Sequence, residues 1–183
     1  MHVDFGRYAK HEYERRWLLH ALPVALDANR PASLIADHYL DGTRFRVRQR
    51  VRLSDKEVVW KLTQKFPEAD GAIDRVVITN CYLTREEYET FRRLPGLRLV
   101  KHRWLLELAG VQYGVDAYQE NLAGLITAER EFPTHEALRA SLRESSPFEN
   151  AIDVTDRLEF TGGALAGKLF SDLAATIPPH VRR

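Results

Sequence analysis

Short stretches of alternating apolar and polar residues make up most of the chain, and turn residues such as Asp41-Gly42, Pro95-Gly96 and Gly110 separate them. This period of two predicts β-strands. The predicted strands cover Tyr8–Leu19, Ser33–Leu40, Arg44–Leu53, Val58–Lys65, Asp74–Leu83, Leu97–Leu108, Val111–Tyr118, Leu125–Phe132 and Ile152–Val154. Many short strands at hairpin spacing favour an antiparallel sandwich or barrel over a parallel sheet.

Helical signals interrupt the strand pattern. Thr84, followed three residues later by Glu87, forms a capping box and predicts a helix at Glu86–Leu94. Further helices are predicted from Thr134 to Glu144 and over Ala164–Ile177, with a short helical turn between Pro23 and Pro31. The expected fold class is therefore α+β, mainly antiparallel β, as a barrel with peripheral helices.

Charged residues recur at alternate positions of the predicted strands, so those of one strand share a face. In an antiparallel sheet such a face is usually the solvated one. Here, however, acids concentrate in the first and eighth strands and bases in the third, fourth and sixth, whereas a solvated face tends to mix signs. If these faces point inward, the barrel encloses a polar tunnel. The basic wall then comprises Arg46, Arg48, Lys61, Lys65, Arg75, Lys101 and Arg103, and the acidic group Glu12, Glu14, Glu129 and Glu131, with Asp116 and Asp153 as further candidates.

Such a tunnel needs a ligand of matching chemistry, because buried like charges are costly unless partners or metals neutralise them. Carboxylate oxygens suit Mg²⁺ or Mn²⁺, and Arg or Lys side chains suit phosphate oxygens. A metal-bound polyphosphate satisfies both groups at once. Asp116 is equally well explained as the ion-pair partner of an arginine in the wall.

Composition narrows the function further. The 183 residues fit one domain, residues 1–183, and the formal net charge of +1 argues against binding to nucleic acid or membrane surfaces. Cys81 is the single cysteine, which excludes an internal disulfide and a cysteine-rich zinc site. With no evident signal peptide, a cytoplasmic location is expected. Monomer and homodimer both remain open.

The run Glu12-Tyr-Glu14-Arg-Arg16 resembles the amino-terminal Glu-x-Glu-x-Lys signature of the CYTH superfamily, the triphosphate tunnel metalloenzymes. Short motifs similar to those of the family follow in the same order along nearly the whole chain. They are His38-Tyr39-Leu40, Arg46-Val-Arg48, Leu62-Thr63-Gln-Lys65, Leu83-Thr84-x-x-Glu87, Lys101-His-Arg103, Val115-Asp116-x-Tyr118, Ala128-Glu129-x-Glu131-Phe132 and Asp153-Val-Thr155.

This resemblance implies a closed eight-stranded antiparallel tunnel that binds a triphosphate-containing small molecule, most similar to the short bacterial inorganic triphosphatases. Mg²⁺ or Mn²⁺ would be ligated by Glu12, Glu14, Glu129, Glu131 and Asp153. The phosphates would be bound by Arg16, Arg46, Arg48, Lys61, Lys65, Arg75, Lys101 and Arg103. Glu12, Glu14 and Lys65 are the candidate catalytic residues.

The sequence also departs from the family pattern. Arg16 replaces a lysine, Asp153 replaces a glutamate, and Val77 and Thr79 stand where the family usually has acids. Hydrolysis of inorganic tripolyphosphate is the favoured function. The alternatives are hydrolysis of thiamine or nucleoside triphosphate, ATP cyclisation in the same tunnel, or non-catalytic polyphosphate binding. Arg44, Arg50 and Arg52 lie outside the matched pair and are expected at strand ends or on the surface.

Overall fold

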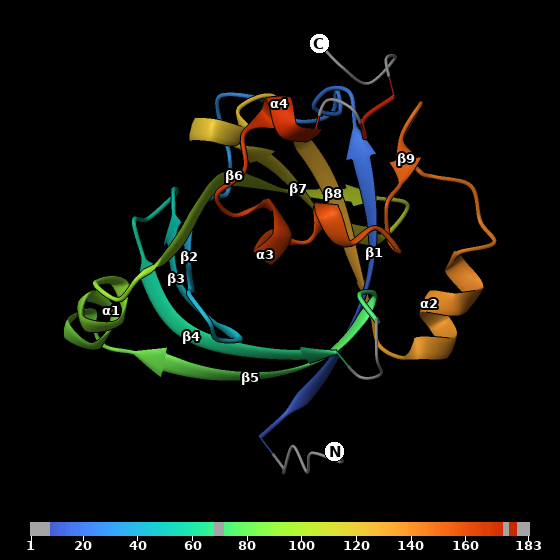
Figure 1. The fold of residues 1–183 in the computed structure, drawn as a ribbon. Coiled ribbons are helices and arrows are strands. Elements are labelled where there is room, and N and C mark those ends of the chain that lie inside the picture. Colours follow the sequence, from blue (N-terminus) through green and yellow to red (C-terminus); the bar gives the residue numbers. More distant parts are fainter. Residues whose placement is uncertain (1–7, 68–71, 174–175, 179–183) are drawn as a thin grey trace.

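The computed structural model describes residues 8–67, 72–173 and 176–178. The strands in this part of the chain form one antiparallel sheet in the order β5-β4-β3-β2-β6-β7-β8-β1-β9, and an additional β5–β1 pairing closes eight of them into a barrel (Figure 1). Their bounds are β1 Lys10–Leu19, β2 Ser33–Leu40, β3 Phe45–Arg52, β4 Val58–Pro67, β5 Arg75–Leu83, β6 Gly96–Leu108, β7 Val111–Tyr118, β8 Ile126–Phe132 and β9 Ile152–Asp153. The predicted fold class is confirmed.

Strand β1 closes the barrel by pairing with three other strands. Its first residues, Lys10 to Tyr13, pair with β5, while Trp17 and Leu18 pair with β9 along the same edge. The opposite edge pairs with β8 from Tyr13 to Leu19. Because β1 bridges the two ends of the sheet, its inward side chains face those of every other strand of the barrel.

Two apolar clusters pack on the outside of the barrel. The helix α1 (Arg85–Arg92) covers β3, β4 and β5 through Tyr88 and Phe91. A second outer cluster, around Trp17, Trp104 and Phe148, lies over the β1, β6, β7 and β8 side. Away from the closed end, the inward faces of the strands are left available for charged residues.

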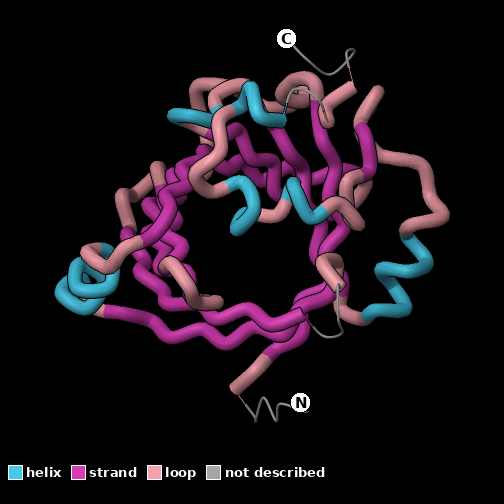
Figure 2. The backbone as a smooth tube through the Cα atoms, in the orientation of Figure 1, coloured by secondary structure: helices cyan, strands magenta, loops and turns pink. Residues whose placement is uncertain are grey.

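The C-terminal segment closes one end of the barrel (Figures 1 and 2). It contains the 3₁₀ turn η2 (Leu158–Phe160) and two short helices, α3 (Gly162–Leu165) and α4 (Phe170–Leu173). Phe160, Leu165 and Leu173 are buried in one cluster with Leu18 and Leu99 of the barrel. Another 3₁₀ turn, η1 (Glu120–Leu122), contributes Leu122 to this cluster.

Two helix predictions are wrong. The predicted helix Ala164–Ile177 is broken after α3, because Gly167 adopts a left-handed conformation with φ of 77°, a common helix terminator. The segment between Pro23 and Pro31 contains turns, and the Asp27 carboxylate accepts a hydrogen bond from the Asn29 backbone N–H at 2.9 Å. The helix after Thr134, α2, is shorter than predicted and spans His135–Ser141. None of the helices described has the length and apolar character of a membrane span.

A glycine in the closing segment lets Tyr39 pack against it, and this predicts a specific steric sensitivity. A Cβ added at Gly162 would lie 2.2 Å from Tyr39 Oη, whereas one at Gly163 would lie 3.6 Å from its nearest neighbour. We expect Gly162→Ala to lower the free energy of unfolding by about 1–3 kcal/mol through overpacking, and Gly163→Ala to leave it nearly unchanged. Urea denaturation measures both.

The Tyr39→Phe background provides the control, because removing Oη leaves Cζ, at 3.4 Å, as the nearest Tyr39 atom to the added Cβ. The cost of Gly162→Ala is expected to shrink in this background. An undiminished cost would show that the close contact with Oη is not its cause.

Candidate active site inside the barrel

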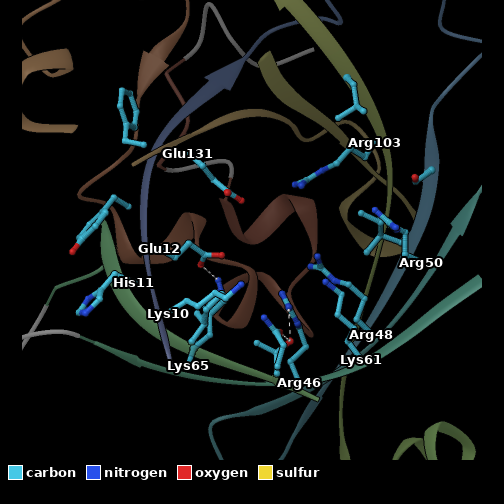
Figure 3. A pocket seen from close by; sticks show the side chains of 18 of the residues that line it. Lys10, His11, Glu12, Arg46, Arg48, Arg50, Lys61, Lys65, Arg103 and Glu131 are labelled. Carbon is cyan, nitrogen blue, oxygen red and sulfur yellow. Dashed lines mark hydrogen bonds and ion pairs between the residues drawn. The ribbon is translucent and has the colours of Figure 1, made fainter. Parts of the chain in front are cut away.

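Two adjoining cavities, of about 420 and 380 Å³, lie inside the barrel. The outer chamber is the larger one, and it is also lined by Lys10, Arg50 and Lys61. The inner chamber is also lined by Leu158, Thr161, Gly162 and Gly163 of the closing segment. The two chambers share six lining residues, which makes them parts of one tunnel: Glu12, Arg46, Arg48, Lys65, Arg103 and Glu131. Figure 3 looks into the outer chamber, with the acids on one wall and most bases on the other.

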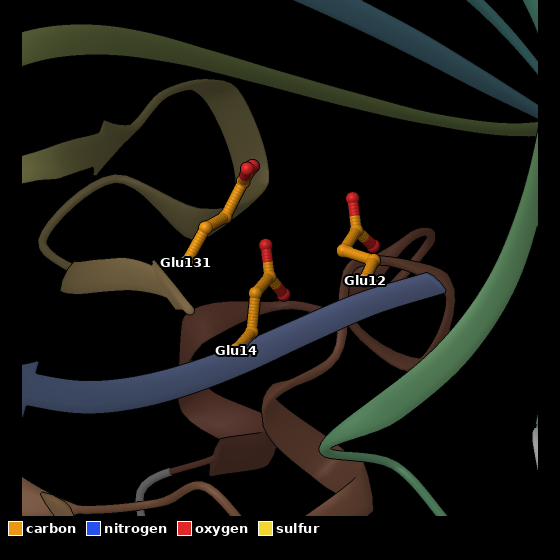
Figure 4. A group of neighbouring side chains, drawn as sticks. All are labelled: Glu12, Glu14 and Glu131. Carbon is orange, nitrogen blue, oxygen red and sulfur yellow. The ribbon is translucent and has the colours of Figure 1, made fainter. Parts of the chain in front are cut away.

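Three carboxylates gather on the acidic wall (Figure 4). One oxygen each from Glu12, Glu14 and Glu131 lies within 4.8 Å of the others. The strand register explains the grouping: Glu14 on β1 lies directly opposite Glu131 on β8, and Glu12 lies two residues before Glu14 on the same face. We call these residues the acidic trio. Their oxygen donors suit a hard divalent cation such as Mg²⁺ or Mn²⁺.

The acidic trio carries negative charge that nearby bases do not fully offset. Lys65 Nζ pairs with Glu12, and Arg16 Nη2 lies 2.8 Å from a Glu14 oxygen. Even so, burial, together with the nearby charges of Glu129 and Glu12, raises the pKa of Glu14 to about 7. A divalent cation placed among the trio would relieve this repulsion.

Glu129 does not join the trio, although the sequence predicted it as a metal ligand. Its two oxygens accept from Arg16 Nε at 3.1 Å and from Arg103 Nη2 at 2.6 Å. Burial alone would raise the pKa of Glu129. The positive charges around it, first that of Lys101, outweigh burial and hold this pKa well below its ordinary value. Glu129 therefore orients arginines of the basic wall.

Asp116 is completely buried and also pairs with the wall. It accepts from Lys101 Nζ at 2.5 Å and from both Arg103 nitrogens Nε and Nη2 at 2.6 Å. The ion-pair interpretation of Asp116 is confirmed. Lys101 and Arg103 thus face the tunnel with part of their charge already offset.

Asp37 on β2 is a tunnel residue that the sequence reasoning missed. Its carboxylate accepts from Arg48 Nε at 2.6 Å and Nη2 at 2.8 Å, and lies 3.5 Å from Arg46 Nε. Burial alone would raise the pKa of Asp37, but the two arginines, Arg48 first, hold it far below its ordinary value. One feature of the sequence could have indicated this role: Asp37 is an acid on the same strand face as Tyr39, which belongs to the His38-Tyr39-Leu40 motif. Its role follows only from the register, which places Asp37 opposite Arg48.

The charges of Arg46 and Lys61, on β3 and β4, are less fully neutralised by acidic neighbours. Arg46 donates to Thr63 Oγ1 at 3.1 Å, which leaves it with only the longer contact to Asp37. Lys61, opposite Arg48, has its pKa lowered by burial and by the guanidinium groups of Arg48, Arg46 and Arg50. The three guanidinium groups around Lys61 thus add to the effect of burial, and such a group of positive charges favours an anionic ligand.

Asp153 is not brought to the acidic trio, in contrast to the sequence prediction. It lies on β9 opposite Trp17 and accepts from Arg15 Nε at 2.7 Å. Arg15 alternates with the tunnel residues Glu14 and Arg16, so it points to the outer face. Its guanidinium also donates to the carbonyls of Ser141 and Glu144, and the Asp153–Arg15 pair therefore attaches the end of α2 to the barrel.

Arg75 also lies outside the tunnel, contrary to its predicted place in the basic wall. It lies opposite Tyr13 in the β1–β5 register, and its Nη1 approaches the His135 ring at 3.4 Å. The tunnel-facing residues of β5 are Val76, Ile78 and Asn80. These tunnel-facing residues of β5 include no acid. Val77 and Thr79, which stand where the family usually has acids, lie on the other face of the strand.

The three outlying arginines of β3 and its flank differ from one another. Arg52 pairs with Asp55 and Glu57 on the surface, as predicted. Arg50, predicted at a strand end or on the surface, lines the outer chamber because it shares the inward face of Arg46 and Arg48. Arg44 packs over the Phe66 ring at 4.6 Å and lines the inner chamber.

Comparison with known proteins identifies the fold. No family model and no curated protein matches the chain. Two crystal structures of NE1496, one named as an inorganic triphosphatase, match with TM-scores of 0.55 and 0.54 at 21% identity. They cover 86% and 85% of this chain and 99% and 93% of their own. The candidate adenylate cyclase bh2851 from Bacillus halodurans matches with a TM-score of 0.52 at 15% identity, over 78% of this chain and 96% of its own.

The chain shares the barrel fold of these structures. The fold that the motif resemblance implied, a closed antiparallel barrel of eight strands, is thereby confirmed. Within this barrel, the trio and the charge pairs of Asp37, Asp116 and Glu129 are features of the chain's own side chains.

The buried pair of Asp37 and Arg48 predicts a large effect on stability. Asp37→Asn leaves a buried guanidinium without its counter-charge, so we expect a loss of about 3–5 kcal/mol in the free energy of unfolding at pH 7. Because the folded-state pKa of Asp37 is depressed, its contribution is present above pH 4 and falls as the pH is lowered further. Urea denaturation at several pH values measures both effects. Asp55→Asn, which breaks an exposed pair with Arg52, should change stability far less.

The raised pKa of Glu14 predicts the opposite pH dependence in metal-free protein. The folded state binds this proton more tightly than the unfolded state, so stability falls as the pH rises from about 5 to about 7. Glu14→Gln mimics the protonated form and should raise stability at pH 8 by about 1–3 kcal/mol, with little gain at pH 5. Thermal unfolding in EDTA measures this, with the exposed Glu149→Gln as control. Equal gains at both pH values would contradict the prediction.

Proposed function

We propose that the chain is a metal-dependent triphosphatase that hydrolyses inorganic tripolyphosphate inside the barrel. The proposal rests on one observation: the acidic trio and a basic wall with surplus positive charge line the same cavity. A divalent cation neutralises the first and a polyanion the second. The inorganic triphosphatase NE1496 shares the fold, which supports the proposal.

The acidic trio fits a magnesium or manganese ion by the chemistry of its donors, three carboxylates within reach of a common point. Glu12, Glu14 and Glu131 would hold the ion. When bound, it would act as a Lewis acid on the phosphate oxygens and offset the charge that develops in the transition state.

The basic residues position the substrate. Arg46, Arg48, Lys65 and Arg103 line both chambers, and we therefore expect the triphosphate to bind between the basic wall and the trio. In the reaction, a water oxygen attacks the terminal phosphorus, the bridging P–O bond breaks, and pyrophosphate leaves. A trio carboxylate accepts the proton of the water. The fork of Arg48 is held by Asp37 before substrate arrives, so little reorganisation is needed on binding.

A ring-bearing triphosphate, such as a nucleoside or thiamine triphosphate, is the second candidate substrate. The inner chamber carries Tyr39, Phe45 and Leu158 beside its charged residues, and such a mixed lining suits a neutral ring attached to phosphate. A non-catalytic polyphosphate binder is the other candidate, favoured by the uncharged β5 wall at Val76, Ile78 and Asn80.

Removing one member of the trio tests the proposed reaction. We expect Glu14→Gln and Glu131→Gln each to lower the rate of phosphate release from tripolyphosphate at least about 100-fold, because each loses a charge aimed at the reacting group. Phosphate release is measured with Mg²⁺ and with Mn²⁺, and ATP and thiamine triphosphate are tested alongside.

Glu149→Gln, an exposed change in the loop after α2, should retain full activity. The wild-type protein could instead bind tripolyphosphate in the presence of metal and release no phosphate from any of the three compounds. This result would contradict the triphosphatase proposal and favour the non-catalytic binder. Faster release from ATP or thiamine triphosphate would instead select the ring-bearing substrate.

A further inference from the structure

Arg50 extends the basic wall beyond the two arginines that the motifs match. It lies on the same face of β3 as Arg46 and Arg48, and it lines the outer chamber (Figure 3). Two residues of a strand span about 6.7 Å, so the wall continues by this distance beyond Arg48. It continues away from the closing segment, whose residues line the inner chamber.

Arg50 also differs from its neighbours in having no acidic partner among the residues described. Arg48 is held by Asp37, and Arg52, the next arginine outward, is paired with acids on the surface. Arg50 Nε is buried without a hydrogen-bond acceptor in the described part of the chain. A buried, charged donor of this kind is costly unless a ligand satisfies it.

Lys61 lies near Arg50 on the neighbouring strand. It is opposite Arg48 in the β3–β4 register and lines the outer chamber. Within the described ranges it forms no ion pair, and its ammonium lies 5.6 Å from the Tyr82 ring centroid. Its surroundings contain the guanidinium groups of Arg46, Arg48 and Arg50, so the field at this place is positive. Together, Arg50 and Lys61 offer donors and charge for one more anionic group.

The geometry points to an additional phosphate subsite at Arg50 and Lys61, through which the tunnel binds linear polyphosphates longer than tripolyphosphate. This inference rests on the proposed function for placing three phosphates among the residues shared by both chambers. A longer chain would then extend outward past Arg48, where Arg50 and Lys61 meet its next phosphate. The subsite thus selects for chain length.

Calorimetric binding of tripolyphosphate and tetrapolyphosphate to the full chain in EDTA tests the subsite, because contacts of Arg50 need no metal and the proposed hydrolysis does not proceed. We expect tetrapolyphosphate to bind about 10-fold more tightly, as one additional charged contact allows. Arg50→Gln should reduce this preference to less than about threefold while changing tripolyphosphate affinity little. Arg52→Gln, the matched control on the same strand face, should preserve it.

Three outcomes would overturn the subsite: no chain-length preference in the wild type, an equal loss for both ligands in Arg50→Gln, or the same loss of preference in Arg52→Gln. Circular dichroism of each variant confirms that it is folded. The proposed hydrolysis is tested separately by phosphate release with metal. A chain-length preference without phosphate release would support the subsite and contradict the triphosphatase proposal. Phosphate release without a chain-length preference would support the triphosphatase and contradict the subsite.

Discussion

The structure depends on one electrostatic constraint: charged side chains that a closed barrel turns inward need an opposite charge, either from the protein or from a ligand. Water cannot fully solvate groups in the tunnel, and an isolated buried charge is costly. Asp37, Asp116 and Glu129 meet this need by holding arginine and lysine side chains in place. These pairs fix the shape of the basic wall before any ligand binds.

The unbalanced charges define the binding chemistry. On one side, three carboxylates lie close together, and burial, together with the nearby charges of Glu129 and Glu12, raises the pKa of Glu14. On the other, Arg50 and Lys61 lie in a positive field without acidic partners among the described residues. Since a protein tolerates such groups where a ligand neutralises them, the two imbalances are the basis on which we propose a cation bound to a polyanion.

Apolar packing stabilises the barrel at two places. Two clusters cover its outside, and a third fills its closed end, where Leu18 and Leu99 of the strands meet Phe160, Leu165 and Leu173 of the C-terminal segment. The charged lining of the tunnel lies beyond this closed end. Most of the apolar packing is therefore separate from the charged side chains of the tunnel.

The sequence by itself determined the strands and most of the charged wall, because alternation with a period of two assigns residues to faces. That the sheet closes into a barrel of eight strands followed from the resemblance of its motifs to those of a known family. The tertiary structure decided which face each strand turns inward and which charged side chains form pairs. It moved Arg75 and Asp153 to the outer face, because β1 and β5 pair in a register that sets Arg75 beside Tyr13, and β9 brings Asp153 to Arg15. It also placed Asp37 against Arg48, since register joins residues that are distant in sequence and no local pattern records it.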